Sequence, residues 1–199
     1  PYEECRAEAV ALYLGLERGV MQIFGMKNPD DEFKAAHILW LNMVRAGVVG
    51  LEFYTPETKQ WRQAHMRARF CILQVLLRQE NSIVTIDHDG DKLIVKVDAK
   101  RILTDGKAAI GELLKHLNIN KAINDVAAGT SYFEELTAVD EKFVAIRETV
   151  MKLRKPRKQF VQPHTRLNAD GSDVELVEFE GSVEGAIEAF VTRHKDIPL

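Results

Sequence analysis

The amino-acid sequence predicts a mainly α-helical fold with a small β-hairpin, followed by a C-terminal strand–helix unit. Apolar residues recur at helical spacing through most of residues 2–154, which predicts packed helices. Two β-branched runs flank the turn sequence Asp87–Asp91 and predict the hairpin. With 199 residues, 46% of them hydrophobic, the chain is long and apolar enough to form a sizeable core.

The first predicted helix covers Tyr2–Arg18 and is apolar nearly all round, which is typical of a buried helix. Its first two turns nevertheless carry Glu3, Glu4 and Glu8. Glu4 and Glu8 lie one above the other on one face, and Glu3 points about a quarter-turn away. If buried, the three acids must be paired, protonated or bound to a metal. The alternative is a frayed, solvated first turn, where acids favour the positive end of the helix dipole.

Two more segments complete the N-terminal part of the chain. A short apolar piece at Val20–Phe24 lies between glycine-containing turns. A long helix is predicted over Asp31–Phe53 because its apolar residues recur at helical spacing. Gly47 and Gly50 weaken the prediction for its last turns.

The next predicted helix covers Glu57–Arg78 and follows a Thr-Pro start signal. Arg62, His65 and Arg69 recur along one side of it, at spacings of three and four residues. Such a row of donors suits a carboxylate, a carbonyl oxygen or an oxyanion. The alternative is a solvated basic face with an exposed His65.

The predicted hairpin covers Ser82–Asp98, with a loop somewhat longer than two residues. Its Asp-x-Asp-Gly-Asp turn lacks the bidentate glutamate of a calcium-binding EF-hand loop at the required spacing, which favours a simple turn. Further helices are predicted at Ala99–Leu103, Lys107–Leu117, Lys121–Ala128, Tyr132–Ala138 (or one helix joining these last two) and Asp140–Arg154.

The chain then changes character. Residues 152–158 contain five cations, which indicate a solvated linker face more than a phosphate-binding surface, because no aromatic side chains interleave them. We expect a domain boundary near residues 155–168, with domains at 1–160 and 161–199. The elements predicted beyond the run are an extended segment at Gln159–Pro163, a turn at Asn168–Gly171, a strand at Asp173–Glu180 and a helix at Ser182–His194.

Composition narrows the possible partners. A net charge of -3 provides no general attraction to nucleic acid or to an anionic membrane. The sequence contains no apolar run as long as a membrane span, so we expect no membrane partner. Cys5 and Cys71, the two cysteines, each lie in an apolar helical pattern. This placement indicates buried thiols in a reducing compartment, with the cytoplasm as the expected location.

The string Glu-Glu-Cys-Arg-Ala-Glu at residues 3–8 resembles the second signature motif of the dipeptidyl peptidase III family. These enzymes are zinc exopeptidases that remove dipeptides from the N-termini of short peptides. The resemblance extends over nearly the whole chain, through Trp40–Gly47, Leu51–Pro56, Trp61–Met66 and Val161–Leu167.

The resemblance implies a zinc site. Glu4 would be a Zn2+ ligand, and Glu3 and Glu8 would accept hydrogen bonds that orient histidine ligands. None of the six histidines in this sequence is followed by Glu and a second His at ligand spacing. The family supplies its two histidine ligands and its catalytic glutamate from a His-Glu-Leu-Leu-Gly-His stretch upstream of the acidic motif.

The resemblance also implies roles toward the substrate. His65 would stabilise the reacting carbonyl, Arg69 follows it on the same face as a second catalytic candidate, and Arg166 would contact bound peptide across a cleft. In the family a helical upper lobe carries the zinc and a mixed α/β lower lobe faces it. Residues 1–160 would belong to the upper lobe and 161–199 to the lower one.

Pro1 directly precedes a helix of buried type, so we expect the chain to be a fragment of a longer polypeptide. Its partners would be short peptide substrates and the remainder of that polypeptide, and the fragment alone would bind zinc weakly and show little activity. The alternative is a noncatalytic helical interaction module, in which the acidic motif is structural and the basic run binds a partner.

Overall fold

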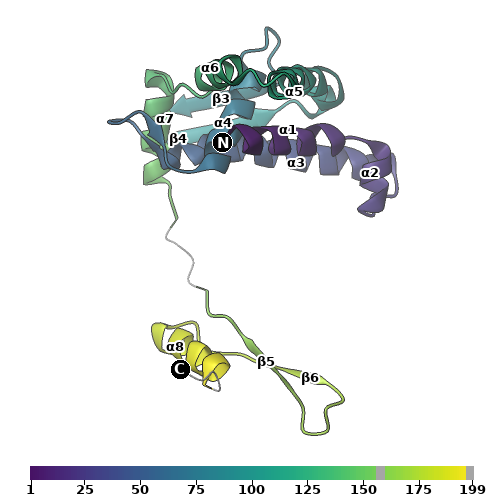
Figure 1. Cartoon of the computed structure of the whole chain (residues 1–199), viewed down its shortest axis with the longest axis vertical. Helices are drawn as coiled ribbons and strands as arrows, with labels where there is room; N and C mark the ends of the chain where they lie inside the picture. Colours follow the sequence, from purple (N-terminus) through teal and green to yellow (C-terminus); the bar gives the residue numbers. More distant parts are fainter. Residues whose placement is uncertain (156–159, 196–199) are drawn as a thin grey trace. The chain divides into compact units, whose positions relative to one another are not determined.

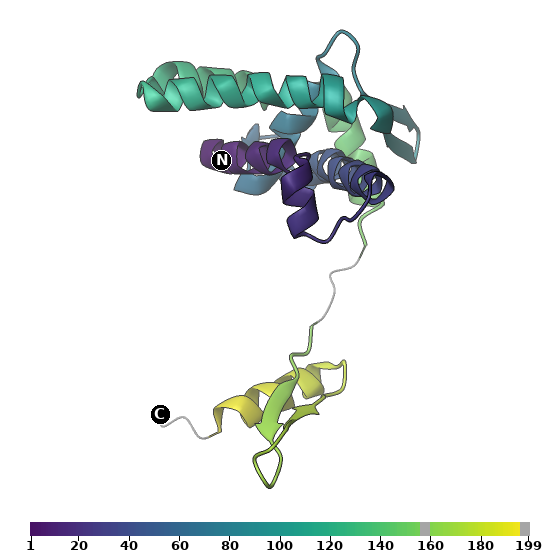
Figure 2. The same cartoon turned by 90° about the vertical axis from the view of Figure 1, so that its right-hand side faces the viewer.

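A computed structural model describes residues 1–155 and 160–195 (Figures 1 and 2). It confirms a mainly α-helical fold with small antiparallel hairpins. The chain forms two compact units, Pro1–Arg154 and Lys155–Leu199, which we call the first and second units. The assignment of residues 1–160 and 161–199 to two lobes of an enzyme stays a prediction. Among the described residues, no helix is both long and apolar enough to cross a membrane.

The first unit is built mainly of helices. Its helices are α1 (Tyr2–Leu14), α2 (Arg18–Ile23), α3 (Pro29–Val49), α4 (Ala64–Leu77), α5 (Lys107–Ala122), α6 (Val126–Leu136) and α7 (Glu141–Lys152). Its strands are β1 (Tyr54–Thr55), β2 (Gln60–Trp61), β3 (Val84–Asp89) and β4 (Lys92–Val97), and short helical turns lie at Gly50–Phe53, Ala99–Arg101 and Ile102–Gly106. α5 and α6 form one layer over the layer that contains α1 and α3 (Figures 1 and 2).

α4 is the central helix of the first unit and packs against α1, α3 and α5. The residues from Phe70 to Leu76 are all buried, which agrees with their almost uninterrupted apolar sequence. α3 approaches α4 closely at Gly47, where an added Cβ would lie 2.7 Å from the backbone oxygen of Arg69. α3 continues to Val49 through this glycine, because Gly47 is buried against α4 instead of being exposed to water.

Several predicted boundaries of helices are wrong. The helix predicted over Glu57–Arg78 begins only at Ala64, because β1 and β2 form a small hairpin whose turn includes Lys59 at φ 52°. The first helix ends at Leu14, four residues early. α5 extends to Ala122, and Asn124, at φ 58°, separates it from α6. Asparagine tolerates this left-handed conformation better than most residues.

The predicted β3–β4 hairpin is present, but its loop is shorter than predicted. Pairing runs from Val84 opposite Val97 to Asp89 opposite Lys92, so the turn contains two residues. Gly90 takes φ 57° there, a conformation that a two-residue hairpin turn commonly requires. The Thr149 hydroxyl donates to the Gly90 carbonyl at 3.1 Å and fixes the turn to α7.

The second unit contains a hairpin and one helix. β5 (His164–Leu167) pairs antiparallel with β6 (Val174–Val177), and α8 (Val183–His194) follows. β5 was not predicted as a strand, and β6 is shorter than the predicted strand at Asp173–Glu180. Residues 156–159, which include part of the basic run and the start of the predicted extended segment, lie outside the described residues.

Candidate functional site

The first turns of α1 and α4 bring four side chains together, which we call the α1–α4 cluster: Glu4, Glu8, His65 and Arg69. His65 Nδ1 lies 3.3 Å from Glu4 Oε2 and 3.4 Å from Glu8 Oε1. Arg69 donates to Glu8 Oε1 from Nε at 2.9 Å and approaches the same oxygen with Nη2 at 2.8 Å. Four of the six predicted site residues therefore lie at one place.

The helical repeat explains this arrangement. Glu4 and Glu8 are four residues apart on α1, and His65 and Arg69 are four residues apart on α4, so each pair forms a row along its helix. The buried residues Cys5 and Cys71 bring the two helices into contact beside these rows. The acidic row of α1 thus faces the row of His65 and Arg69 on α4.

The two acids of the cluster differ in burial. The Glu8 side chain is 16% exposed, and one of its oxygens is occupied by Arg69. The Glu4 side chain is 40% exposed, and in the described part of the chain its only ion-pair partner is His65. An accessible carboxylate of this kind fits a zinc ligand, since zinc accepts oxygen as well as nitrogen and sulfur donors. Glu4 is therefore the member of the cluster best placed to hold a metal.

The described residues do not form a complete metal site around Glu4. Within residues 1–155 and 160–195, no group of three or more His, Cys, Asp and Glu side chains is arranged to hold a metal ion. The donor set that this part of the chain offers around Glu4 is one accessible carboxylate, beside an acid and a histidine that already contact each other.

Glu3 lies outside the α1–α4 cluster. Its Oε2 accepts from Lys121 Nζ of α5 at 2.6 Å and from Arg6 Nη2 at 2.9 Å. Lys121 first, and Arg6 next, hold the pKa of Glu3 below its usual range by stabilising the ionised carboxylate. The predicted role of Glu3 in orienting histidine ligands is not tested by these contacts and stays a prediction.

Arg166 belongs to β5 of the second unit. Its Nε donates to Glu175 Oε2 at 2.9 Å, across the hairpin, and both side chains are largely exposed. Its predicted contact with bound peptide also stays a prediction. Arg62, which was predicted to share a helical row with His65, precedes α4 and donates to the Glu52 carbonyl at 2.6 Å.

Two cations of the basic run form ion pairs with acids. Lys152 Nζ lies 2.9 Å from Asp91 Oδ1, and Arg154 Nη1 lies 3.0 Å from Glu52 Oε1. Both pairs lie within the first unit. Lys152 and Arg154 are thus already paired with acids of the first unit, although a partner-binding surface would need their charges.

Comparison with known proteins shows that the chain is similar to proteins named dipeptidyl peptidase 3. It is 43% identical over 197 residues to a dipeptidyl peptidase 3 of Dictyostelium discoideum, covering 97% of this chain and 28% of that protein. Identities to the dipeptidyl peptidases 3 of Rattus norvegicus and Homo sapiens are 47% and 46% over 201 residues, each covering 96% of this chain and 27% of the relative.

The family follows from a second comparison. The profile of Peptidase family M49 matches residues 1–194, and the chain belongs to this family. The predicted resemblance to dipeptidyl peptidases is thereby confirmed. The chain spans about a quarter of the length of the relatives described above, at 27–28% of each.

Proposed function

We propose that this chain forms part of the active site of a zinc-dependent exopeptidase that releases N-terminal dipeptides from short peptides in the cytoplasm. The observation that supports the proposal is the α1–α4 cluster, in which Glu4, Glu8, His65 and Arg69 converge from two helices. The remainder of a longer polypeptide would complete the site with two histidine ligands and a catalytic glutamate.

Glu4 would hold the zinc ion through its accessible carboxylate. Zinc, when bound, supplies Lewis-acid activation of water and of carbonyl groups. Glu8 and Glu3 would accept hydrogen bonds from the histidine ligands and keep their rings oriented.

His65 would stabilise negative charge on the peptide carbonyl oxygen. Its Nδ1 faces the two carboxylates of α1, at 3.3 Å from Glu4 Oε2 and 3.4 Å from Glu8 Oε1, and would donate to one of them as an N–H. Nε2 is then the ring nitrogen available to a substrate, to which it donates when it carries a proton.

Arg69 forms an ion pair with Glu8. This pair would reduce the electrostatic repulsion between Glu4 and Glu8 beside the His65 ring. Arg166 would contact the bound peptide from the second unit.

Replacing Glu4 tests the metal assignment. In the longer polypeptide, we expect Glu4→Ala to remove most of the bound zinc and nearly all dipeptide release, because one of three protein ligands is lost. Zinc content is measured by mass spectrometry of the purified protein, and dipeptide release with a dipeptidyl naphthylamide. Glu112→Ala, at an exposed acid of α5, is the matched control and should retain both. A Glu4→Ala protein with unchanged zinc content contradicts the assignment.

The isolated 199-residue chain provides a second test. We expect it to bind zinc weakly and to release little dipeptide, since Glu4 alone cannot hold the ion as a full ligand set does. Stoichiometric zinc and full turnover in the isolated chain would show that the site is complete without further polypeptide.

The interaction-module alternative makes the opposite predictions. It requires that His65 and Arg69 are dispensable for activity, and that charge reversal at Lys155 and Arg157 abolishes partner binding. Arg157 lies outside the described residues, and the ion pairs of Lys152 and Arg154 do not favour this alternative.

A further inference from the structure

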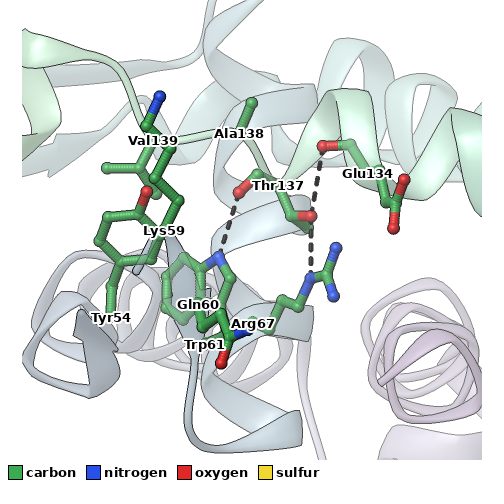
Figure 3. Close-up of a pocket in the computed structure, with 9 residues that line it drawn as sticks. All are labelled: Tyr54, Lys59, Gln60, Trp61, Arg67, Glu134, Thr137, Ala138 and Val139. Atoms are coloured by element: carbon green, nitrogen blue, oxygen red, sulfur yellow. Dashed lines mark hydrogen bonds between the residues drawn. The ribbon is translucent and has the colours of Figure 1, made fainter. Parts of the chain in front are cut away.

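A pocket of about 620 Å³ lies on the first unit between the β1–β2 hairpin, the first turns of α4 and the C-terminal end of α6. It extends from Tyr54 and Lys59 at one end to Arg67 and Glu134 at the other (Figure 3). Its volume falls in the range of small-molecule sites, which is about 300–1,000 Å³. None of its lining residues belongs to the α1–α4 cluster.

The guanidinium of Arg67 is the unusual group of this pocket. Its Nε donates to Thr137 Oγ1 at 2.9 Å, and its Cζ lies 4.9 Å from the centre of the Phe133 ring. The Thr137 hydroxyl donates in turn to the Phe133 carbonyl at 2.9 Å, so its proton is already used. Figure 3 shows the two terminal nitrogens of Arg67 directed away from Trp61, on the side where the Glu134 carboxylate lies.

Comparison with similar arginines shows what Arg67 lacks. The other half-buried arginines of the first unit, Arg6, Arg69, Arg101 and Arg147, each form an ion pair with a carboxylate. For Arg67, no carboxylate oxygen of residues 1–155 or 160–195 lies within 4.0 Å of the guanidinium nitrogens. Burial lowers the pKa of Arg67, which means that the charged form is partly desolvated without full compensation.

The rest of the pocket offers one accessible aromatic ring, that of Trp61, because Tyr54 behind it is only 4% exposed. The rings of Tyr54 and Trp61 lie 5.3 Å apart, and the indole N–H of Trp61 donates to the Thr137 carbonyl at 3.1 Å. Since that N–H is satisfied, the indole ring presents an apolar surface to a ligand. An anion-binding group and an accessible aromatic ring thus lie in one pocket.

We propose that this pocket binds a carboxylate carried on an apolar or aromatic body, with the carboxylate on the terminal nitrogens of Arg67 and the body against Trp61. Planar guanidinium groups bind carboxylates with two parallel hydrogen bonds, which an ammonium group cannot do. Two sources offer this chemistry: a small aromatic acid, or the C-terminal residue of a peptide. Glu134 tunes the site by repelling the bound anion.

The test is a titration of the whole chain with N-acetyl-phenylalanine, followed by NMR. The sequence contains two tryptophans, so each indole N–H gives its own signal. We expect the Trp61 signal to shift and the Trp40 signal to stay, because Trp40 is fully buried away from solvent. N-acetyl-phenylalanine amide, which lacks the charge, should bind about tenfold more weakly or worse, as expected for loss of a charged hydrogen bond. Equal binding of acid and amide, or an unmoved Trp61 signal, would overturn the proposal.

Variants locate the carboxylate within the pocket. Arg67→Gln should weaken binding by about tenfold or more, and Arg67→Lys should restore only part of it. Arg78→Gln, at an exposed arginine after α4 that pairs with Glu135, is the matched control and should bind like the unaltered chain. Lys59→Gln should change affinity less than about threefold, since exposed cations contribute little. A large loss in Lys59→Gln with none in Arg67→Gln would refute the placement.

Two further arms complete the experiment. Glu134→Gln should bind the acid more tightly than the unaltered chain, and weaker binding would contradict a carboxylate beside Glu134. An acetylated tetrapeptide that ends in phenylalanine separates the two sources: tighter binding than the single residue identifies a peptide C-terminus, and equal binding identifies a small acid. Circular dichroism of each variant confirms that the helices are intact, so a loss of binding reports on the pocket.

Discussion

The arginines on the two sides of α4 have different partners. Arg67 and Arg69 are two residues apart and point to nearly opposite sides of the helix. On the side that faces α1, Arg69 meets Glu8 at 2.8 Å. On the side that faces α6, Arg67 meets a hydroxyl and an aromatic ring, with no carboxylate of the described chain within 4.0 Å. The first side is balanced within this chain, and the second has a place for an anion from elsewhere.

The largest expected effect comes from breaking the support of the pocket side. Phe70 is fully buried and lies 5.1 Å from the rings of both Trp61 and Phe143. We expect Phe70→Ala to lower the free energy of unfolding by about 3–5 kcal/mol, because it leaves a cavity in a packed aromatic group. Urea unfolding followed by circular dichroism measures this change.

The control for this experiment is Phe24→Ala. Phe24 is 76% exposed, and we expect its removal to change the free energy of unfolding by no more than about 0.5 kcal/mol. Similar losses in the two variants would show that the aromatic group is not part of the stabilising core.

A smaller effect is expected from the α3 side of α4. In Gly47→Ala the new Cβ would meet the Arg69 backbone oxygen at 2.7 Å and Leu73 Cβ at 2.9 Å, so the helices must move apart. We expect a loss of about 1–2 kcal/mol, after the gain in helix propensity is subtracted. The same substitution at Gly19, which has no atom within 4 Å of an added Cβ, should be neutral or slightly stabilising. Thermal unfolding of both variants separates steric conflict from propensity.

The smallest effects compare the two arginines directly. Arg69→Met leaves Glu8 partly buried without its main partner, and we expect a loss of about 1 kcal/mol in the free energy of unfolding. Arg67→Met removes a charge that has no ion-pair partner in the described residues. Its lost hydrogen bond and ring contact are offset by relief of desolvation, so we expect a change within about 0.5 kcal/mol. Equal losses in the two variants would contradict the difference between the two sides.

Much of the α1–α4 cluster could be predicted from the sequence. Glu4 and Glu8 form a helical pair by spacing alone, as do His65 and Arg69, and the family resemblance assigned both pairs to one active site without predicting a contact between them. The predicted quarter-turn offset of Glu3 agrees with its position toward Lys121 instead of His65. Local spacing was sufficient for each row, because a row lies on one helix, but not for the contact between the two rows.

Other features could not be predicted, because they depend on contacts between distant segments. Residues 57–63 have helical spacing, yet pairing of Tyr54 with Trp61 keeps them out of α4. Arg67 and Thr137 are 70 residues apart, so no pattern in the sequence connects them. An arginine without an acid nearby in space looks the same in sequence as one with an acid.

Gly47 shows how a site can depend on a residue that has no chemistry of its own. Because residue 47 is a glycine, the backbone of α3 can lie close to the backbone of Arg69 on α4. A Cβ at this position would meet the Arg69 backbone oxygen at 2.7 Å. Gly47 thus lies against the backbone of a residue of the α1–α4 cluster without contributing a side chain to it. The helix that carries His65 and Arg69 therefore packs closely against α3, which contributes no group to the cluster.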